Sequence, residues 1–465
     1  MGKFTKRPAF KLLTGIAALL LVAGCSSDDD DNGVVGTGTP AGAPDGDGDG
    51  GAPAGGVFVM SNILEGNTVV AYQRAADGTL TLAGEFATGG NGGDFDGAEG
   101  LDPLISAYAI INTPDNEYLM AVNAGSNTIS VMEINDDMTL DLVDTESSFG
   151  VGPNSLAYNN GLVYVTNIAA EGGDFAGEPD QEGSIYGYTF ADGNLTPLGP
   201  DSLRELNNRP AAVRFSPDGG TLLVTSINSG SNQLASADQD SIVAFTIDEN
   251  GLPSENITGG ATSTFQGNAE NRNLPSAIGF EVTDRSNGTF AIVTEAREFT
   301  AAGDPPNFPG LQSGSVSVYQ VNDDGSLAGT QLDLIAGQSA IRGQGQITTC
   351  WIVLSPDGEY FFVSNAIDAT ISSFRFTDAS GNIELIEEVA ASGTGPGTET
   401  DPALGFATTD GWIDLDMTDD GQYLYQLFGL SGAVGVYAVD GGNLTLVETV
   451  SGNLPEENTQ GIVSF

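Results

Sequence analysis

The chain has 465 residues, 40% of them hydrophobic, so it is long enough for one large or two ordinary domains with a sizeable core. Asp and Glu total 63 against 13 Lys and Arg, and the formal net charge of −50 repels nucleic acid and anionic lipid, so nucleic acid is not an expected partner. The sequence contains no histidine, which excludes Ser-His-Asp and Cys-His catalysis and every histidine metal site.

Residues 1–24 have the layout of an export signal. A basic start precedes an apolar run at 12–23, which is too short to span the roughly 30 Å hydrocarbon core of a bilayer. The run leads into "VAGC" (22–25), which resembles the lipobox of bacterial lipoproteins, where the cysteine carries the lipid after cleavage. We therefore expect Cys25 to anchor the protein in the bacterial cell envelope, in the outer membrane, with exposure at the cell surface left open. An ordinary secretory signal with a chance cysteine is the alternative.

Residues 25–56 are predicted to form an acidic tether. They are rich in Gly, Asp and Pro and almost free of large apolar side chains, a composition typical of solvated linkers. The stretch "DGDGDG" (45–50) matches the first half of an EF-hand calcium loop. The twelfth loop position is Gly56 in place of the required Glu, and no helical pattern flanks the stretch, so a plain linker is the favoured interpretation.

From residue 57 onward the sequence repeats one unit of four short β-rich runs. "AAVRFSPDGGTLLVTSIN" (211–228) matches "CWIVLSPDGEYFFVSNAI" (350–367), and 107–124 and 412–429 follow the same plan. Each match is a strand, a turn of the Pro-Asp-Gly kind and a second apolar strand, and a third and fourth strand follow. Four antiparallel strands joined by tight turns are typical of a propeller blade.

The number of blades follows from a unit that is split between the two ends of the chain. Six units are complete. Residues 56–86 supply the second, third and fourth strands of a seventh, and "TQGIVSF" (459–465) supplies its first strand. The sequence therefore predicts an all-β, seven-bladed β-propeller over residues 57–465, closed by pairing of the C-terminal strand with residue 57 onward, which removes a free sheet edge.

Nearly all long connections fall on one predicted face of the propeller. Strands alternate in direction within a blade, so the loops between strands 2 and 3 and those between blades share one end of the ring. Two acidic stretches, 92–102 and 172–183, share a Gly-Gly-Asp-Phe start; Ca²⁺ is a candidate ligand, although solvated loops are favoured because no ligand spacing is visible. No other cofactor is expected. The long connections are 87–105, 168–183, 228–241, 257–274 and 298–314.

Three stretches carry a resemblance to a known family: "ATGGNGG" (87–93), "YLMAVNAGSNTISVMEI" (118–134) and "LPSAIGFEVTDRSNGTFAIVTEA" (274–296). With the repeat layout, they resemble the seven-bladed lactonase-like propellers, which include 6-phosphogluconolactonase and carboxymuconate cyclase relatives. The resemblance covers residues 57–465. It is more specific for the fold than for an activity.

The resemblance also implies where catalytic residues would lie. Active lactonases of this group place Pro-Arg-His at the start of one innermost strand and a Glu at the end of the next strand. The matching positions here are Pro275, Ser276, Ala277 and Glu295. Glu295 is therefore the candidate general base. The Arg and His are replaced by small residues, so the cation that would hold an anionic substrate or an oxyanion is missing.

Three arginines are candidates to replace that cation and to bind a ligand: Arg297, Arg342 and Arg214. Arg214 falls within an expected innermost strand, as do Asp414 and Asp416 of "WIDLDM". We expect these charges to form a structural ion pair inside the ring, because buried charges are normally paired, and a ligand site is the less favoured alternative.

Two tryptophans and one cysteine complete the candidate residues. Trp351 and Trp412 begin innermost strands of neighbouring blades, where they are expected either to stack on a ligand at the channel mouth or to pack between blades. Cys350 lies in the apolar stretch "CWIVL" and is expected to be a buried thiol.

Two classes of function fit these observations. The first is a membrane-anchored binding or scaffold propeller that lacks the Arg-His pair and recognises an unknown small molecule or surface protein. The second is a lactone hydrolase that acts on a neutral lactone with Glu295 as general base. A monomer is expected in both cases.

Overall fold

The structure is a computed structural model whose compact unit spans Gly51–Phe465. Residues 1–51, which contain Cys25 and almost all of the expected tether, lie outside the described residues. The structure describes residues 52–94, 102–170, 183–206, 209–227, 240–262, 276–296, 314–335, 348–366, 368–393, 398–401, 406–409 and 411–465.

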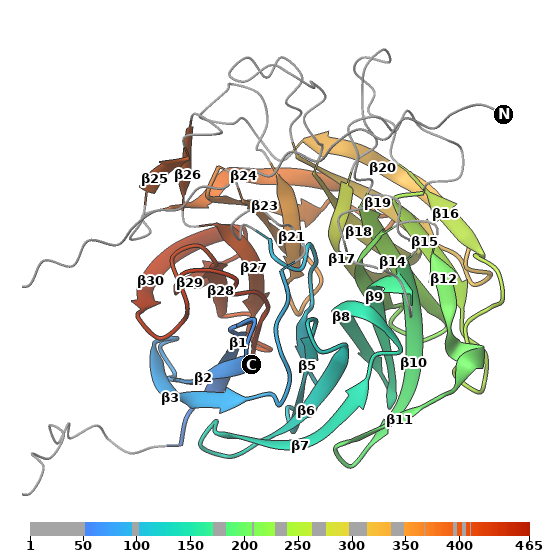
Figure 1. The fold of residues 1–465 in the computed structure, drawn as a ribbon. Coiled ribbons are helices and arrows are strands. Elements are labelled where there is room, and N and C mark those ends of the chain that lie inside the picture. The colour runs from blue at the N-terminus through green and yellow to red at the C-terminus, as the bar shows by residue number, and fades with distance from the viewer. Residues whose placement is uncertain are drawn as a thin grey trace, which may run out of the picture. The chain divides into compact units, whose positions relative to one another are not determined.

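Seven antiparallel sheets, each with four strands in radial order, follow one another around a central channel, and a short extra strand pairs within one of them. Figure 1 shows this arrangement. This arrangement confirms the predicted all-β, seven-bladed propeller. In order from the innermost strand, the blades are: blade 1, β31 (Ile462–Ser464), β1 (Gly55–Met60), β2 (Thr68–Arg74) and β3 (Leu80–Ala87); blade 2, β4 (Ile110–Asn112), β5 (Tyr118–Asn123), β6 (Thr128–Ile134) and β7 (Leu140–Ser147); blade 3, β8 (Gly150–Asn159), β9 (Leu162–Ala170), β10 (Gly183–Ala191) and β11 (Asn194–Pro197); blade 4, β13 (Arg209–Phe215), β14 (Thr221–Ile227), β15 (Ile242–Thr246) and β16 (Gly259–Ala261); blade 5, β17 (Ser276–Arg285), β18 (Gly288–Ala296), β19 (Ser315–Val321) and β20 (Leu327–Ile335); blade 6, β21 (Thr349–Leu354), β22 (Tyr360–Asn365), β23 (Thr370–Phe376) and β24 (Ile383–Ser392); and blade 7, β27 (Trp412–Met417), β28 (Tyr423–Phe428), β29 (Ala433–Asp440) and β30 (Asn443–Ser451).

Blade 1 is completed by the last strand of the chain, as the split seventh unit predicts. β31 pairs antiparallel with β1, so that Phe58 lies opposite Val463. The Phe465 ring stacks on Phe58 with 5.8 Å between centroids, and Arg74 Nε donates a hydrogen bond to the Phe465 carbonyl oxygen over 2.9 Å. A Cβ atom on Gly55 would lie 1.9 Å from the same oxygen, so only glycine fits beside this end of the closing strand.

Four strands and one short 3₁₀ turn differ from the expectation from the sequence. β16 lies inside the stretch 257–274 that was expected to be an inter-blade connection, because its sequence "GGA" lacks the β-branched and aromatic residues typical of strands. β12 (Arg204–Leu206) pairs with β10 beyond a short 3₁₀ turn at Pro200–Ser202. β25 (Thr398–Asp401) and β26 (Phe406–Thr409) form a hairpin, which follows β24 of blade 6 and precedes β27 of blade 7 in the chain.

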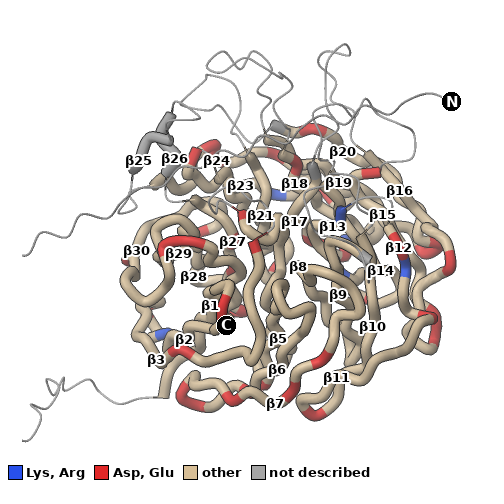
Figure 2. Tube along the Cα trace, in the orientation of Figure 1, with Lys and Arg blue, Asp and Glu red and all other residues tan. Residues whose placement is uncertain are grey.

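Acidic residues dominate the charge of the described chain. Figure 2 shows red acidic positions along the turns and outer strands, and few blue basic ones. The carboxylates therefore far outnumber the arginines that could pair with them. Ion pairs among the described residues include Arg214–Glu281 (2.7 Å), Arg285–Glu359 (3.2 Å) and Arg375–Glu384.

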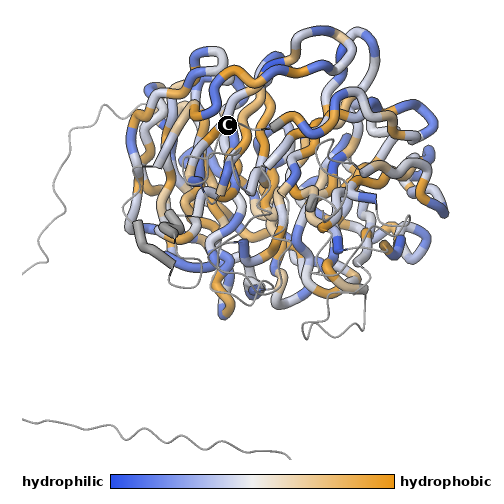
Figure 3. Tube along the Cα trace, turned by 90° about the horizontal axis from the view of Figure 1, so that it is seen from above, coloured by the Kyte–Doolittle hydropathy of each residue, from blue (hydrophilic) through white to orange (hydrophobic). Residues whose placement is uncertain are grey.

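The inner strands of a blade are buried, whereas the outermost strand is half exposed. β1 is buried at every position, while β3 in the same blade has no buried residue. β28 and β30 of blade 7 show the same contrast. Neighbouring blades cover both faces of the inner strands, which is why these strands are continuous apolar runs. Figure 3 shows the hydrophobic positions inside the body and hydrophilic ones at many of the turns.

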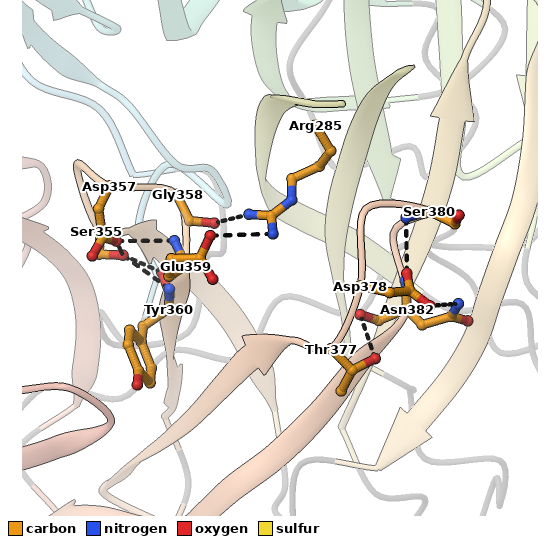
Figure 4. Close-up of polar contacts among 10 residues, drawn as sticks. All are labelled: Arg285, Ser355, Asp357, Gly358, Glu359, Tyr360, Thr377, Asp378, Ser380 and Asn382. Atoms are coloured by element: carbon orange, nitrogen blue, oxygen red, sulfur yellow. Dashed lines mark hydrogen bonds and ion pairs between the residues drawn. The ribbon is translucent and has the colours of Figure 1, made fainter. Parts of the chain in front are cut away.

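The Pro-Asp-Gly turns are fixed by hydrogen bonds within the turn. Ser355 Oγ donates to Asp357 Oδ1 over 2.6 Å, and the same oxygen accepts the Glu359 N–H over 2.9 Å, as Figure 4 shows. Gly358 has a φ of 68°, a conformation that glycine adopts without strain. Arg285 of the neighbouring blade donates to the Gly358 carbonyl oxygen over 2.7 Å. These contacts fix where the innermost strands end, and so the shape of the channel mouth.

Candidate functional site

A cavity of about 440 Å³ lies within the central channel. All seven innermost strands, β31, β4, β8, β13, β17, β21 and β27, contribute residues to its wall. Ligand sites of proteins are commonly concave spaces of this size that combine apolar walls with a few polar groups. The polar groups here include Arg214, Glu281, Asp414 and Asp416.

The cavity extends to the face of the propeller that carries the short turns. Its wall includes Pro114, Asn116, Pro217 and Asp419, which lie in turns between first and second strands. The sequence placed the longest loops on the opposite face, and most of their residues lie outside the described ones. The cavity therefore extends to the face with the short turns, and not to the face where the long loops are expected.

The other end of the cavity is crossed by residues 102–109, here called the plug segment, which connects blade 1 to β4. Tyr108 OH donates a hydrogen bond to the Phe280 carbonyl oxygen of blade 5 over 2.7 Å. The Ala107 N–H donates to the Ala211 carbonyl oxygen of blade 4 over 3.3 Å. These contacts cross the ring and place Ala107 and Tyr108 in the cavity wall.

Three further hydrogen bonds, from the side chains of Trp351 and Gln460, tie the plug segment to blades 6 and 1. Trp351 Nε1 donates to the Ser106 carbonyl oxygen over 2.8 Å. Gln460 Nε2 donates to the same oxygen over 2.8 Å and to Asp102 Oδ1 over 2.7 Å. The plug segment is therefore anchored to blades 1, 4, 5 and 6. Only its last residues, 107–109, fall within the repeat unit at 107–124, and the repeat does not indicate that they cross the channel.

Arg214 forms the positive centre of the cavity. Its Nη2 atom lies 2.7 Å from Glu281 Oε1, and its guanidinium carbon lies 3.7 Å from the centre of the Tyr108 ring. Burial lowers the pKa of Arg214, but Glu281 and Tyr108 raise it by more, so the guanidinium stays charged. Burial raises the pKa of Glu281, and Arg214 opposes that rise. The expected ion pair in the ring thus exists, although its partner is Glu281 and not Asp414 or Asp416.

Asp414 and Asp416 are neighbours on one face of β27, two residues apart. Asp414 Oδ2 accepts the Gly461 N–H over 3.0 Å, and Asp416 Oδ2 accepts the Ser464 N–H over 2.6 Å and the Ser464 hydroxyl over 3.2 Å. Burial raises the pKa of each carboxyl group to about 7. Both side chains therefore hold the closing strand and also line the cavity.

The two tryptophans have different surroundings. Trp351 lies in the cavity wall, with its indole N–H held by the plug segment. Trp412 is fully buried and packs against Phe428, with 4.8 Å between ring centroids, and it is not part of the cavity wall. Cys350 is buried as expected, and burial raises the pKa of its thiol.

Glu295 lies near the end of β18, away from the cavity wall. It is fully buried, opposite Ala277 in the β17–β18 ladder, and its Oε2 atom accepts a hydrogen bond from Ser315 Oγ over 2.7 Å. Pro275, Arg297, Arg342 and the side chain of Ser276 lie outside the described residues. The proposed catalytic role of Glu295 therefore stays a prediction.

The predicted Ca²⁺ site and the predicted membrane anchor also stay predictions. Residues 95–101 and 171–182, which make up most of the acidic stretches considered for Ca²⁺, lie outside the described residues. Among the residues that the structure does describe, no three Cys, Asp or Glu side chains are grouped so that they could hold a metal ion. The same part of the chain contains no helix with the length and hydropathy of a membrane span.

Comparison with known proteins supports the fold. Residues 312–398 match the family described as "Lactonase, 7-bladed beta-propeller". No curated protein matches the chain. Three solved structures illustrate the likeness: a candidate 6-phosphogluconolactonase from Bacteroides uniformis (TM-score 0.53, 19% identity, 86% of this chain and 98% of that one), another from Bacteroides fragilis (0.50, 16%, 89% and 98%) and a hypothetical selenium-binding protein from Sulfolobus tokodaii (0.57, 10%, 89% and 94%). At these sequence identities, the likeness shows a shared fold alone. In its fold and in the matched segment, the chain resembles the seven-bladed lactonase-like propellers.

Proposed function

We propose that this protein is a cell-envelope lipoprotein whose lactonase-like propeller binds a small ligand in the central cavity. The observation that carries the proposal is the convergence of all seven innermost strands on one cavity that is lined by a guanidinium and four carboxyl groups. Such a concave space with a few oriented polar groups is the usual form of a ligand site. A surface protein remains the alternative partner, docked on the turns around the cavity mouth.

The proposal excludes phosphorylated lactones as ligands of this cavity. Among the described residues that line it, Arg214 is the only arginine or lysine, and it is already paired with Glu281. Asp414, Asp416 and Asp419 line the same space, so a phosphate group would meet more negative than positive charge. An anionic substrate therefore does not match the electrostatics of the cavity.

Hydrolysis of a neutral lactone by Glu295 is the second candidate function. Its support is the match of Glu295 to the glutamate position of the family, and its weakness is the methyl group of Ala277 opposite it in the ladder. A buried carboxylate is able to act as a general base, but catalysis also requires a group that stabilises the oxyanion.

One pair of assays separates the two functions. The purified protein is tested for hydrolysis of neutral and phosphorylated lactones beside Glu295→Gln, and for thermal stabilisation by a small-molecule library beside Asp414→Asn. The binding proposal expects background hydrolysis and a ligand whose stabilising effect is lost in Asp414→Asn. Turnover that disappears in Glu295→Gln, without any ligand that distinguishes Asp414→Asn, would replace the proposal with the hydrolase.

A further inference from the structure

We propose that the ligand of the central cavity is a small organic cation, bound through an ammonium group by Asp414 and Asp416. This inference rests on the proposed binding function and names the chemical class of its ligand. It follows from the charge balance of the cavity, from the hydrogen-bonding state of the two carboxyl groups and from the charge around the cavity mouth.

The cavity has more carboxyl groups than cations to pair with them. Glu281 is paired with Arg214 over 2.7 Å. Asp414 and Asp416 form no ion pair within the described part of the chain, although Arg214 acts on Asp416 at longer range. Asp414 is only 5% exposed. Burial raises the pKa of both groups to about 7, so part of each is neutral near that pH. A ligand that brings positive charge into this space would favour the ionised carboxylates, because buried charges are normally paired.

The two carboxyl groups are held by hydrogen bonds from neutral groups and contact no cation within the described part of the chain. Asp414 Oδ2 is held by the Gly461 N–H, and Asp416 Oδ2 by the N–H and hydroxyl of Ser464. The backbone N–H of Asp414 itself also contacts the Asp414 carboxyl group, and the Met417 N–H contacts that of Asp416, so the partners of both groups are backbone N–H groups and one hydroxyl, and both residues line the cavity. Two acceptors two positions apart on one strand suit an ammonium group, which has three donors and no acceptor.

The cavity mouth would attract a cation. Its turns carry Asp115 and Asp218, and hydrogen bonds from Thr113 and Ser216 lower the pKa of these carboxyl groups, so both are ionised at neutral pH. Asp419 lines the mouth itself. A cleft lined by one sign of charge concentrates ions of the opposite sign and speeds their entry.

The remaining wall suits the apolar part of an organic ion better than a bare metal ion. Leu156, Ile462 and Trp351 contribute apolar surface to the cavity. The carboxyl groups of this site do not belong to any metal-binding group of three among the described residues. The ring face of Tyr108 is covered by Arg214, so the ammonium group is expected at the β27 side of the cavity.

Isothermal titration calorimetry with three probes of equal length tests the inference. 1,4-Diaminobutane, 1,4-butanediol and succinate share a four-carbon chain and differ in charge. We expect binding of the diamine alone. Asp414→Asn and Asp416→Asn should each weaken it by about tenfold or more, since each removes a charge-assisted hydrogen bond. Asn keeps an acceptor oxygen for the closing strand, and an unchanged melting temperature verifies the fold. Asp77→Asn, an exposed substitution in the β2–β3 turn on the same face of the ring, is the matched control and should leave the affinity unchanged.

The outcomes separate the ligand class from the binding function. Diamine binding that is unchanged in both channel variants would place the cation elsewhere on the acidic surface and overturn the inference. Binding of the diol or of succinate that depends on Asp414 would also overturn it, but would preserve the binding function. If no compound of a wider neutral, cationic and anionic library distinguishes the wild type from the channel variants, the binding function fails as well.

Discussion

Arg214 and Tyr108 stack across the central channel, with 3.7 Å between the guanidinium carbon and the ring centre. Arg214 belongs to blade 4, whereas Tyr108 belongs to the plug segment that leads into blade 2. Blades that are not neighbours in the ring are thereby joined through one side chain. Glu281 of blade 5 pairs with the same guanidinium. Arg214 therefore connects blade 4, blade 5 and the plug segment at the wall of the cavity.

Removal of Arg214 should destabilise the propeller. We expect Arg214→Met to lower the free energy of unfolding by about 2–3 kcal/mol, because it leaves the carboxyl group of Glu281 without its partner. The loss should be smaller than for a fully buried pair, since 33% of the Arg214 side chain is exposed. Denaturant unfolding measures the change. The double variant Arg214→Met/Glu281→Gln should recover part of the loss; additive losses would show that the pair is not coupled.

Removal of the closing strand should destabilise the whole ring. Deletion of 460–465 exposes the edge of β1 and takes away the contacts of Phe465 with Phe58 and Arg74. We expect the melting temperature to fall by several degrees. A synthetic peptide of residues 459–465, added in excess, should restore part of it. A truncated protein that melts with the wild type would show that the other six blades hold the ring by themselves.

Stability should decrease as the pH rises towards neutrality. Burial raises the pKa of Asp414 and Asp416 to about 7, above the value of about 3.9 in an unfolded chain. The two carboxyl groups therefore bind protons more tightly in the folded protein than in the unfolded chain. Their contribution to the free energy of unfolding is fully present below about pH 4 and is lost as the pH rises through 7. Unfolding free energies between about pH 5 and pH 8 measure the loss. Asp414→Asn/Asp416→Asn should show a shallower slope, which separates these groups from the general charge of the chain; an equal slope would contradict the assignment.

Stability should increase with salt. The formal net charge of −50 produces repulsion in the compact state. Raising the salt concentration from about 0.01 M to about 0.15 M shortens the screening length from about 30 Å to about 8 Å. We expect a higher melting temperature at the higher concentration. A melting temperature that stays constant over this range would indicate that local contacts already compensate the charges.

Replacement of Cys25 should release the protein from the membrane. We propose that the cysteine carries lipid, because it follows an apolar run and small residues in "VAGC" (22–25). Cys25→Ser should move the protein from the membrane fraction to the soluble fraction of a bacterial host. Intact-mass analysis provides the independent measurement, and an unmodified wild-type Cys25 would refute the anchor.

The fold was predictable because the number of blades equals the number of repeat units in the sequence. The turns around Asp218 and Asp357 mark the ends of innermost strands, and the strand at 459–465 has a partner only at the start of the domain. β16 could not be predicted, because Gly259 and Gly260 enter the sheet through backbone hydrogen bonds and have no side chain that signals a strand.

The candidate site was predictable only in part. Arg214, Asp414 and Asp416 are recognisable in the sequence as charged residues within innermost strands, and the structure brings them to one cavity. Glu281 carries the same signal in the stretch "GFEVTD" (279–284) but is not among the candidates predicted from the sequence. Tyr108 falls within the repeat unit at 107–124, but its contact with Arg214 could not be predicted, because the repeat does not reveal which residues face each other across a ring.

Blade 1 contains strands from both ends of the chain, so it cannot be completed until the last strand has been synthesised. Arg74 and Phe465, which meet at its closure, are 391 residues apart in the chain. At synthesis rates of roughly 5–20 residues per second, β31 is made on the order of 20 to 80 s after β1, and the edge of β1 is unpaired during that time. Throughout this interval an apolar strand presents unpaired backbone groups to every other nascent chain nearby. A protein built this way needs either a holding chaperone for its first strands or a way to keep them apart until synthesis reaches the last one.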